Sequence, residues 1–403
     1  MSSHGSAAAS QSSVNAEVLK TVTPPDARGS YVRRNPALDG IRGLAIIWVV
    51  IHNAADISMP SATGVPRAFQ LFAHLGWIGV QLFFALSGFL ITLGLLRSRA
   101  APHYFRDFYA KRALRILPLY YGVLFATLIV LPHIPFKHLA IQTQGQSALW
   151  LFTTNWTQSV PYGFVHFWSL AVEEQFYLLW PFIIWKGTPR HLLFACIWIA
   201  GGALLLRCVL LGAGADWWTL YSNTACRMDA LALGAAGACL LSLPGLRHYL
   251  QHRRRETMIF ALALFLAAIP LTHAYDRMLW RGETLGYTVL ALCAAIFVTA
   301  VASDSAATRH NSVLAWLPLR SIGKYSYAMY VFHGLLNKLI GQPWLVARYG
   351  DTPSTAAVFF YAVTLLLISY LLAYGSYHLF EKHFLNLKRY LGPGARATQD
   401  RQS

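Results

Sequence analysis

Long apolar segments recur along this chain and limit what it can fold into more than any other feature. Hydrophobic runs of about 17–25 residues follow one another, and this is the length that a helix needs to cross a bilayer. Only 12% of the residues are charged, against about a quarter in an ordinary soluble domain. We therefore predict an all-α fold, a polytopic membrane helical bundle of about ten transmembrane helices.

The distribution of basic residues predicts how this bundle is oriented. The predicted spans fall near 38–57, 72–96, 117–133, 167–185, 191–212, 229–243, 257–271, 286–302, 322–340 and 356–380. On alternate sides of these spans, 24 of the 33 Lys and Arg residues lie with the N-terminus and seven lie opposite. Because positive charge marks cytoplasmic loops, both termini are predicted to be cytoplasmic. The net charge of +17 then reflects topology, and no nucleic-acid partner is expected.

The chain is predicted to have one membrane domain, residues 35–385, between two short tails. Residues 1–34 are polar and low in complexity, without the apolar core of a signal peptide, so we expect a disordered cytoplasmic tail. Residues 386–403 are expected to be a second cytoplasmic tail. The five cysteines are scattered through apolar runs, and the histidines show no HExxH or paired spacing. No metal site is expected.

The first span, LDGIRGLAIIWVVIHN, contains two ionisable residues, Arg42 and His52. Such residues are costly inside a membrane and are candidates for function. Arg42 and His52 are ten positions apart, which is about 15 Å along a helix, so Arg42 should lie near the cytoplasmic end and His52 in the outer half. Two structural alternatives remain open. Arg42 could snorkel to the headgroups, and His52 could be a neutral imidazole bonded to a neighbouring helix.

The stretch HFWSLAVEEQFYLLWPF places two carboxylates in an apolar span. On a helix, Ser169, Glu173 and Tyr177 share one stripe, whereas Glu174 is turned away by about 100°. The predicted depth of Glu173 matches that of His52. We therefore expect this carboxylate to bond to one ring nitrogen of His52 and make the other a better base. The alternative is an ion pair that only holds helices together.

Three further groups of polar residues are candidates for binding. Arg112 and Arg115 share a helical face and suit phosphate, although they could instead be positive-inside anchors on lipid headgroups. Arg227 and Asp229 begin the sixth span as a substrate site or as a cap pair. A last stripe is expected to line a pore or to contact another helix, with His333 as a substrate-binding candidate; it consists of Ser326, Tyr330, His333 and Asn337.

Together these motifs resemble the acyltransferase-3 family of membrane O-acyltransferases. The matching segments are LDGIRGLAIIWVVIHN, GWIGVQLFFALSGFLIT, FYAKRALRILPLYY, HFWSLAVEEQFYLLWP and TACRMDALALG, in family order, with weaker matches at SYAMYVFHG and FEKHF. The resemblance implies a ten-helix fold that transfers acyl groups, commonly acetyl from acetyl-CoA, to hydroxyls of glycans or related acceptors. It also implies that the family's functional residues correspond to Arg42, His52, Arg112, Arg115, Ser169 and Glu173.

The chain departs from the family pattern at two positions. Nine residues separate Arg42 from His52 where the family usually has ten, and Gln81 stands where the family commonly has aspartate. No fused extracytoplasmic esterase-like domain is expected, which leaves delivery to the acceptor to the membrane part or to a partner.

We expect the following reaction in a bacterial inner membrane. Acyl-CoA binds Arg42, Arg112 and Arg115 through its nucleotide, and His52, oriented by Glu173, deprotonates the acceptor hydroxyl. Ser169 or a backbone group bonds to the oxyanion, or His52 carries the acyl group transiently. The expected partners are acyl-CoA, a glycan or glycolipid acceptor that Tyr177 helps to bind, and membrane lipid. The alternative is a transporter or flippase for a lipid-linked saccharide, with the buried charges as a proton relay.

Overall fold

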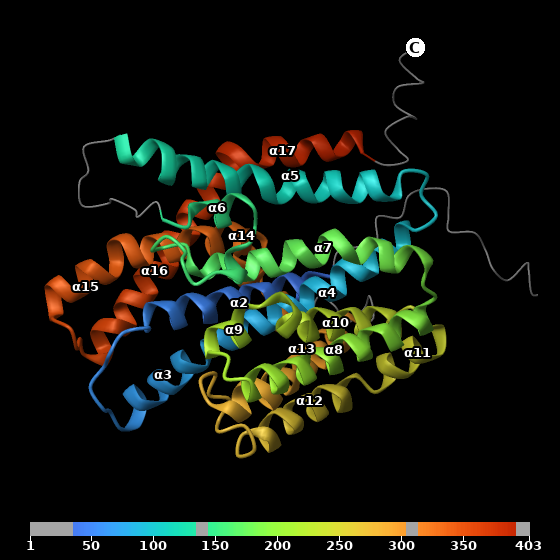
Figure 1. The fold of residues 1–403 in the computed structure, drawn as a ribbon, viewed down its shortest axis with the longest axis horizontal. Coiled ribbons are helices and arrows are strands. Elements are labelled where there is room, and N and C mark those ends of the chain that lie inside the picture. Colours follow the sequence, from blue (N-terminus) through green and yellow to red (C-terminus); the bar gives the residue numbers. More distant parts are fainter. Residues whose placement is uncertain (1–34, 134–143, 304–312, 392–403) are drawn as a thin grey trace, which may run out of the picture. The chain divides into compact units, whose positions relative to one another are not determined.

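The computed structural model describes residues 35–133, 144–303 and 313–391, and within these ranges the chain is helical without any strand (Figure 1). The predicted all-α, polytopic bundle is therefore confirmed. The predicted N-terminal tail, 1–34, lies outside the described residues, as do 392–403. The predicted C-terminal tail begins within helical residues, because α17 (Lys382–Asn386) is followed by a 3₁₀ turn, Leu387–Tyr390.

Each predicted span overlaps a helix. These helices are α2 (Pro36–Ala54), α4 (Ile78–Ser98), α5 (Tyr104–Leu124), α7 (Trp168–Lys186), α8 (Pro189–Gly212), α10 (Thr224–Leu241), α12 (Arg254–Ala268), α13 (Tyr287–Ala302), α14 (Leu317–Leu336) and α16 (Thr355–Ser376). The shorter ones are α3 (Gly64–His74), α6 (Gln146–Trp150), α9 (Trp217–Ser222), α11 (Pro244–His252) and α15 (Gln342–Tyr349). Within the described ranges, seven helical runs are long and apolar enough to cross a membrane, and α7, α12 and α14 do not meet that criterion. The number ten stays a prediction.

Local sequence explains where several of these helices begin. The hydroxyl of Thr188 accepts a hydrogen bond from the backbone N–H of His191, and Pro189 follows as the first residue of α8. Proline suits this position because its missing N–H would have had no partner in the helix. The side chain of Asn223 caps α10 in the same way, at the backbone N–H of Ala225.

Close packing between helices depends on glycine. A Cβ added at Gly88 of α4 would overlap the backbone carbonyl of Leu231 in α10, and one at Gly234 of α10 would overlap that of Ala85. Such contacts bring two backbones together, which is how helices commonly associate in membranes. Helix α10 packs on α4, α8 and α13, while α14 packs on α2 and α16.

The outward faces of the bundle are apolar. On α8, Trp198 is 79% exposed and Leu205 65% exposed, and similar side chains cover α16. Soluble proteins rarely expose contiguous apolar faces of this kind. Together with the seven apolar helical runs, these faces identify an integral membrane protein.

Candidate active site

A basic cavity of about 720 Å³ lies among α2, α4, α5, α7 and α14. One part of its lining is aromatic and aliphatic, and the rest is dominated by cations. The basic side chains that line it are Arg42, Arg97, Lys111, Arg112, Arg115 and Lys388. Three acidic side chains also line it, Asp107, Glu173 and Glu174, so the cations outnumber the acids by six to three. A concave surface with an excess of positive charge attracts anions, so this cavity suits a polyanion.

Six predicted site residues line the basic cavity together: Arg42, Arg112, Arg115, Ser169, Glu173 and Tyr177. Sequence reasoning missed three further cations there. Lys111 lies one turn before Arg115 on α5, so its spacing could have placed it on the same face. Arg97 is one of the 24 basic residues on the predicted cytoplasmic side, which indicates topology and no site. Lys388 belongs to the predicted tail, where no local pattern links it to the cavity.

Helix α5 is held against α7 by two tyrosine hydroxyls and by a ring contact of Arg112. The hydroxyl of Tyr109 donates to the carbonyl of Leu178 at 2.7 Å, and that of Tyr104 donates to the carbonyl of Pro181 at 3.1 Å. The guanidinium of Arg112 stacks 4.0 Å from the centre of the Tyr177 ring. Such a cation–π contact stabilises the guanidinium over the ring, and its N–H groups can still donate hydrogen bonds.

The carboxylate of Glu173 has a different partner from the one that the sequence predicted. It accepts a hydrogen bond of 2.8 Å from the hydroxyl of Ser87 on α4, inside the basic cavity. The expected bond to His52 is therefore wrong as a description of this structure, because His52 lines a different cavity. Glu174, expected to face away, also lines the basic cavity.

The His52 ring is oriented by a backbone carbonyl. Its Nδ1 lies 2.9 Å from the carbonyl oxygen of Ala73 at the end of α3. Because a carbonyl can only accept, Nδ1 carries the proton and Nε2 keeps a lone pair. The segment that follows α3 can lie this close to His52 because Gly76 packs directly against α2. A Cβ at Gly76 would overlap the Trp48 carbonyl and the His52 side chain.

His52 lines a second cavity, of about 180 Å³, which we call the aromatic cavity. Its rings are Trp77, Trp168, Trp217, Trp218, Tyr221, Tyr330 and His166. The charged residues in its lining are Asp56, Arg277 and Lys338. Aromatic faces combined with a few polar groups are typical of sites that bind small polar ligands.

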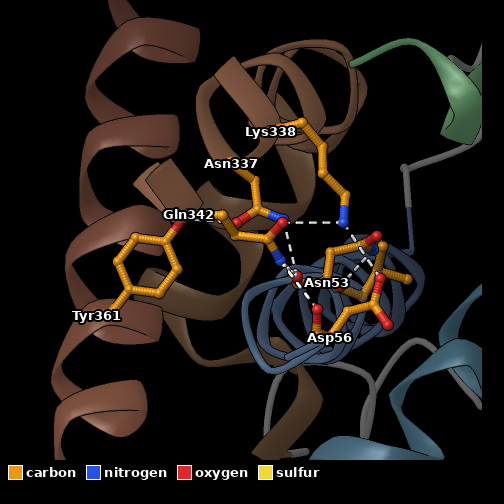
Figure 2. A network of polar contacts seen from close by, with 7 residues as sticks. Asn53, Asp56, Asn337, Lys338, Gln342 and Tyr361 are labelled. Atoms are coloured by element: carbon orange, nitrogen blue, oxygen red, sulfur yellow. Dashed lines mark hydrogen bonds and ion pairs between the residues drawn. The ribbon is translucent and has the colours of Figure 1, made fainter. Parts of the chain in front are cut away.

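A polar network ties the end of α2 to the C-terminal part of the chain, as Figure 2 shows. The Asn337 amide donates to the carbonyl of Asn53 at 2.7 Å, and its oxygen accepts from the Tyr361 hydroxyl at 2.5 Å. The ammonium of Lys338 lies 3.2 Å from the carboxylate of Asp56. Because Asn53 follows His52 directly, this network fixes the part of α2 that carries the imidazole.

Ser169 takes part in a compact hydroxyl pair. Its Oγ lies 2.5 Å from the Tyr330 hydroxyl and 3.3 Å from the carbonyl of His166. The Tyr330 hydroxyl also donates to that same carbonyl at 2.8 Å. The residues of the predicted stripe on α14 therefore lie in different surroundings. Ser326 and Tyr330 line the basic cavity, whereas Asn337 belongs to the network at α2.

The predicted pair of Arg227 and Asp229 is not formed. Asp229 instead makes a buried ion pair of 2.9 Å with Arg207 of α8, which also donates to the Cys226 carbonyl. The guanidinium of Arg227 is fully buried with its centre 4.4 Å from the centre of the Tyr287 ring, and none of its nitrogens has a hydrogen-bond partner among the described residues. Neither residue belongs to the described linings of the two cavities.

His333 is also placed differently from a substrate-binding residue. It is fully buried, and its Nδ1 lies 2.8 Å from the carbonyl of Tyr330 in its own helix. Its ring lies 4.9 Å from that of His166, centre to centre. His166 lines the aromatic cavity, whereas the described linings of both cavities leave His333 out. His333 therefore supports the cavity wall from behind.

The polar side chains of the described residues indicate which kinds of ligand the protein could hold. Among the described residues, no group of three or more His, Cys, Asp or Glu side chains is arranged to hold a metal ion. The polar groups of the two cavities are arginines, lysines, carboxylates, hydroxyls, amides, indole N–H groups and two imidazoles, a set suited to anion binding and proton transfer.

The fold and these cavities define a polytopic membrane protein with a basic cavity next to a cavity lined by His52, an arrangement expected for a membrane-embedded acyltransferase. A family model described as "Acyltransferase domain" matches residues 35–374, and the chain belongs to this family, which confirms the resemblance seen in its motifs.

Similar proteins from three bacteria place the chain in more detail. YrhL of Bacillus subtilis (strain 168) is 29% identical over 377 residues, which cover 86% of this chain and 54% of YrhL. The peptidoglycan O-acetyltransferase OatA of Listeria monocytogenes is 27% identical, over 74% of this chain and 48% of OatA. The O-acetyltransferase OatA of Staphylococcus aureus (strain NCTC 8325 / PS 47) is 27% identical, over 74% and 50%. The chain thus spans about half the length of these relatives, and no solved structure matches it.

Proposed function

We propose that this chain transfers an acetyl group from acetyl-CoA to a hydroxyl of a cell-envelope glycan, in a bacterial inner membrane. The observation that carries the proposal is that the basic cavity adjoins the aromatic cavity that holds His52. Both linings include Val80 and Tyr330. The names of the OatA relatives support acetyl as the group transferred and a glycan as the acceptor.

The donor would bind in the basic cavity as a substrate. Guanidinium groups fork onto phosphate oxygens, and Arg42, Arg112 and Arg115 offer three of them in one space. The apolar part of the lining, including Phe83 and Leu90, suits the less polar pantetheine arm. Glu173 belongs to this side of the reaction, since it holds Ser87 within the same cavity.

The acceptor hydroxyl would approach from the aromatic cavity. The Nε2 of His52 takes its proton while the hydroxyl oxygen attacks the thioester carbonyl. The C–S bond then breaks, and the proton passes from His52 to the sulfur of CoA. Ser169 lies at the same boundary, where its hydroxyl can stabilise the oxyanion. Tryptophan faces beside Asp56 and Lys338 suit the ring and the hydroxyls of a sugar.

Replacement of His52 tests this proposal. We expect His52→Ala to abolish acetyl transfer, with a loss of at least about 100-fold, because the reaction loses its general base. The measurement supplies inside-out membrane vesicles with acetyl-CoA labelled in the acetyl group and counts label retained on envelope glycan.

The matched control is His248→Ala, because His248 is an exposed histidine of α11 outside both linings. It should transfer acetyl at the wild-type rate. Wild-type transfer by His52→Ala would overturn the mechanism. A wild-type protein that moves saccharide without acetyl-CoA would instead favour the transporter.

A further inference from the structure

The basic and aromatic cavities meet at one tyrosine. Val80 of α4 and Tyr330 of α14 belong to both linings, so these two side chains face the donor space on one side and His52 on the other. The Tyr330 ring packs edge-on against Phe83 of the basic cavity, with ring centres 6.3 Å apart. It also lies 5.4 Å from the ring of His166, which faces the aromatic cavity. Tyr330 is therefore fixed from both sides.

The hydroxyl of Tyr330 positions the hydroxyl of Ser169. Both hydroxyls lie within hydrogen-bond distance of the carbonyl oxygen of His166, Tyr330 at 2.8 Å and Ser169 at 3.3 Å. They also lie 2.5 Å from each other, and in that contact either hydroxyl can donate. This arrangement holds the Ser169 hydroxyl at the boundary between the cavities.

We propose that Tyr330 is the partition between donor and acceptor, with two separable functions. Its ring narrows the passage between the two cavities so that a bound acceptor hydroxyl fills it and water of the aromatic cavity does not reach the thioester, and its hydroxyl positions Ser169. The proposal rests on the proposed acetyl transfer. A partition is needed because His52 would also activate water. Water would then add through oxygen to the thioester carbonyl and the C–S bond would break, giving acetate, CoA thiol and one released proton.

Two variants separate the functions of the ring and the hydroxyl. Tyr330→Ala opens the wall, so we expect the ratio of acetate release to acetyl transfer to rise at least about tenfold. Tyr330→Phe keeps the ring and removes the hydroxyl. It should lower transfer and acetate release alike, by roughly tenfold, because both reactions pass through the oxyanion that Ser169 stabilises and Ser169 loses its partner. The ratio of acetate release to transfer should therefore stay at the wild-type value. Tyr330→Leu, which keeps more apolar volume, replaces the alanine variant if that protein does not fold.

The matched control is Tyr327→Ala. Tyr327 lies one turn earlier on α14 and lines the basic cavity alone, so its truncation enlarges that cavity and leaves the wall in place. Its ratio of acetate release to transfer should equal the wild-type ratio. The experiment uses inside-out vesicles with acetyl-CoA labelled in the acetyl group, and it separates free acetate from label on glycan.

The outcomes distinguish this partition from the transfer reaction itself. A raised ratio of acetate release to transfer in Tyr330→Ala, with the wild-type ratio in Tyr330→Phe and Tyr327→Ala, supports the partition. An unchanged ratio in Tyr330→Ala and Tyr330→Leu overturns it. A ratio in Tyr330→Phe that is as high as in Tyr330→Ala overturns it as well. If the wild-type protein itself does not use acetyl-CoA, the proposed function fails before the partition is tested.

Discussion

At the scale of single residues, the hydrogen bonds assign Glu173 to the donor side. The carbonyl of Ala73 already fixes the His52 tautomer, and Glu173 accepts from Ser87 in the basic cavity. We therefore expect Glu173→Gln to raise KM for acetyl-CoA about fivefold, since a charge-assisted hydrogen bond becomes a neutral one. The pH dependence of kcat should stay as in the wild-type protein. Initial rates over a range of acetyl-CoA concentrations and pH values check both.

The glutamine variant has a matched control in Glu256→Gln. Glu256 is an exposed acid of α12 that pairs with Arg253 at 3.4 Å, so its replacement should change neither constant. If Glu173→Gln displaced the pH profile of kcat and left KM alone, the carboxylate would act on His52 after all, as the sequence suggested.

At the scale of elements, the end of α2 depends on its attachment to α14 and α16. Asn337 is fully buried and bridges the Asn53 carbonyl to the Tyr361 hydroxyl. Asn337→Ala should lower the free energy of unfolding by about 1–3 kcal/mol, because two buried groups lose their partner. Transfer should fall as well, since His52 precedes Asn53. Thermal unfolding in detergent and transfer in vesicles measure the two effects.

Two smaller changes test the two hydrogen bonds of Asn337 separately. Tyr361→Phe removes one hydrogen bond and keeps the tie to α2, whereas Asn337→Asp keeps the oxygen for Tyr361 and removes the amide donor to Asn53. The aspartate variant should therefore lose more activity than the phenylalanine variant. Equal activity in the two would show that this tie does not position His52.

At the scale of the whole molecule, apolar runs and helical periodicity were enough to predict the helices and the stripe of three site residues on α7. They did not predict that this stripe shares a cavity with the arginines of α2 and α5. Ser169, Glu173 and Tyr177 indeed share the lining of one cavity, as their spacing implied. Which side chains pair across helices could not be predicted from their depth in the membrane alone. Asp229, for example, pairs with Arg207 of another helix and not with Arg227. The bond that orients His52 comes from a backbone carbonyl, which any residue of a neighbouring segment could have supplied.

The orientation of the bundle decides whether the basic cavity can meet acetyl-CoA, which is cytosolic. The excess of Lys and Arg on the N-terminal side predicts that Arg389 lies in the cytoplasm and Arg348 outside. Both residues are exposed. In a cysteine-free background, Arg348→Cys should react with an impermeant maleimide on intact cells, and Arg389→Cys should react only after permeabilisation.

The reverse labelling pattern would place Lys388, and with it the basic mouth of the cavity, on the outer side, where no acyl-CoA is available. The arginines would then have to bind another anion, and the transfer mechanism would lose its donor. A pattern as predicted leaves His52 toward the outer leaflet, where an envelope glycan can reach it. The same labelling experiment therefore tests the topology and the direction of transfer together, because both depend on the asymmetry of charge between the two sides of the bundle.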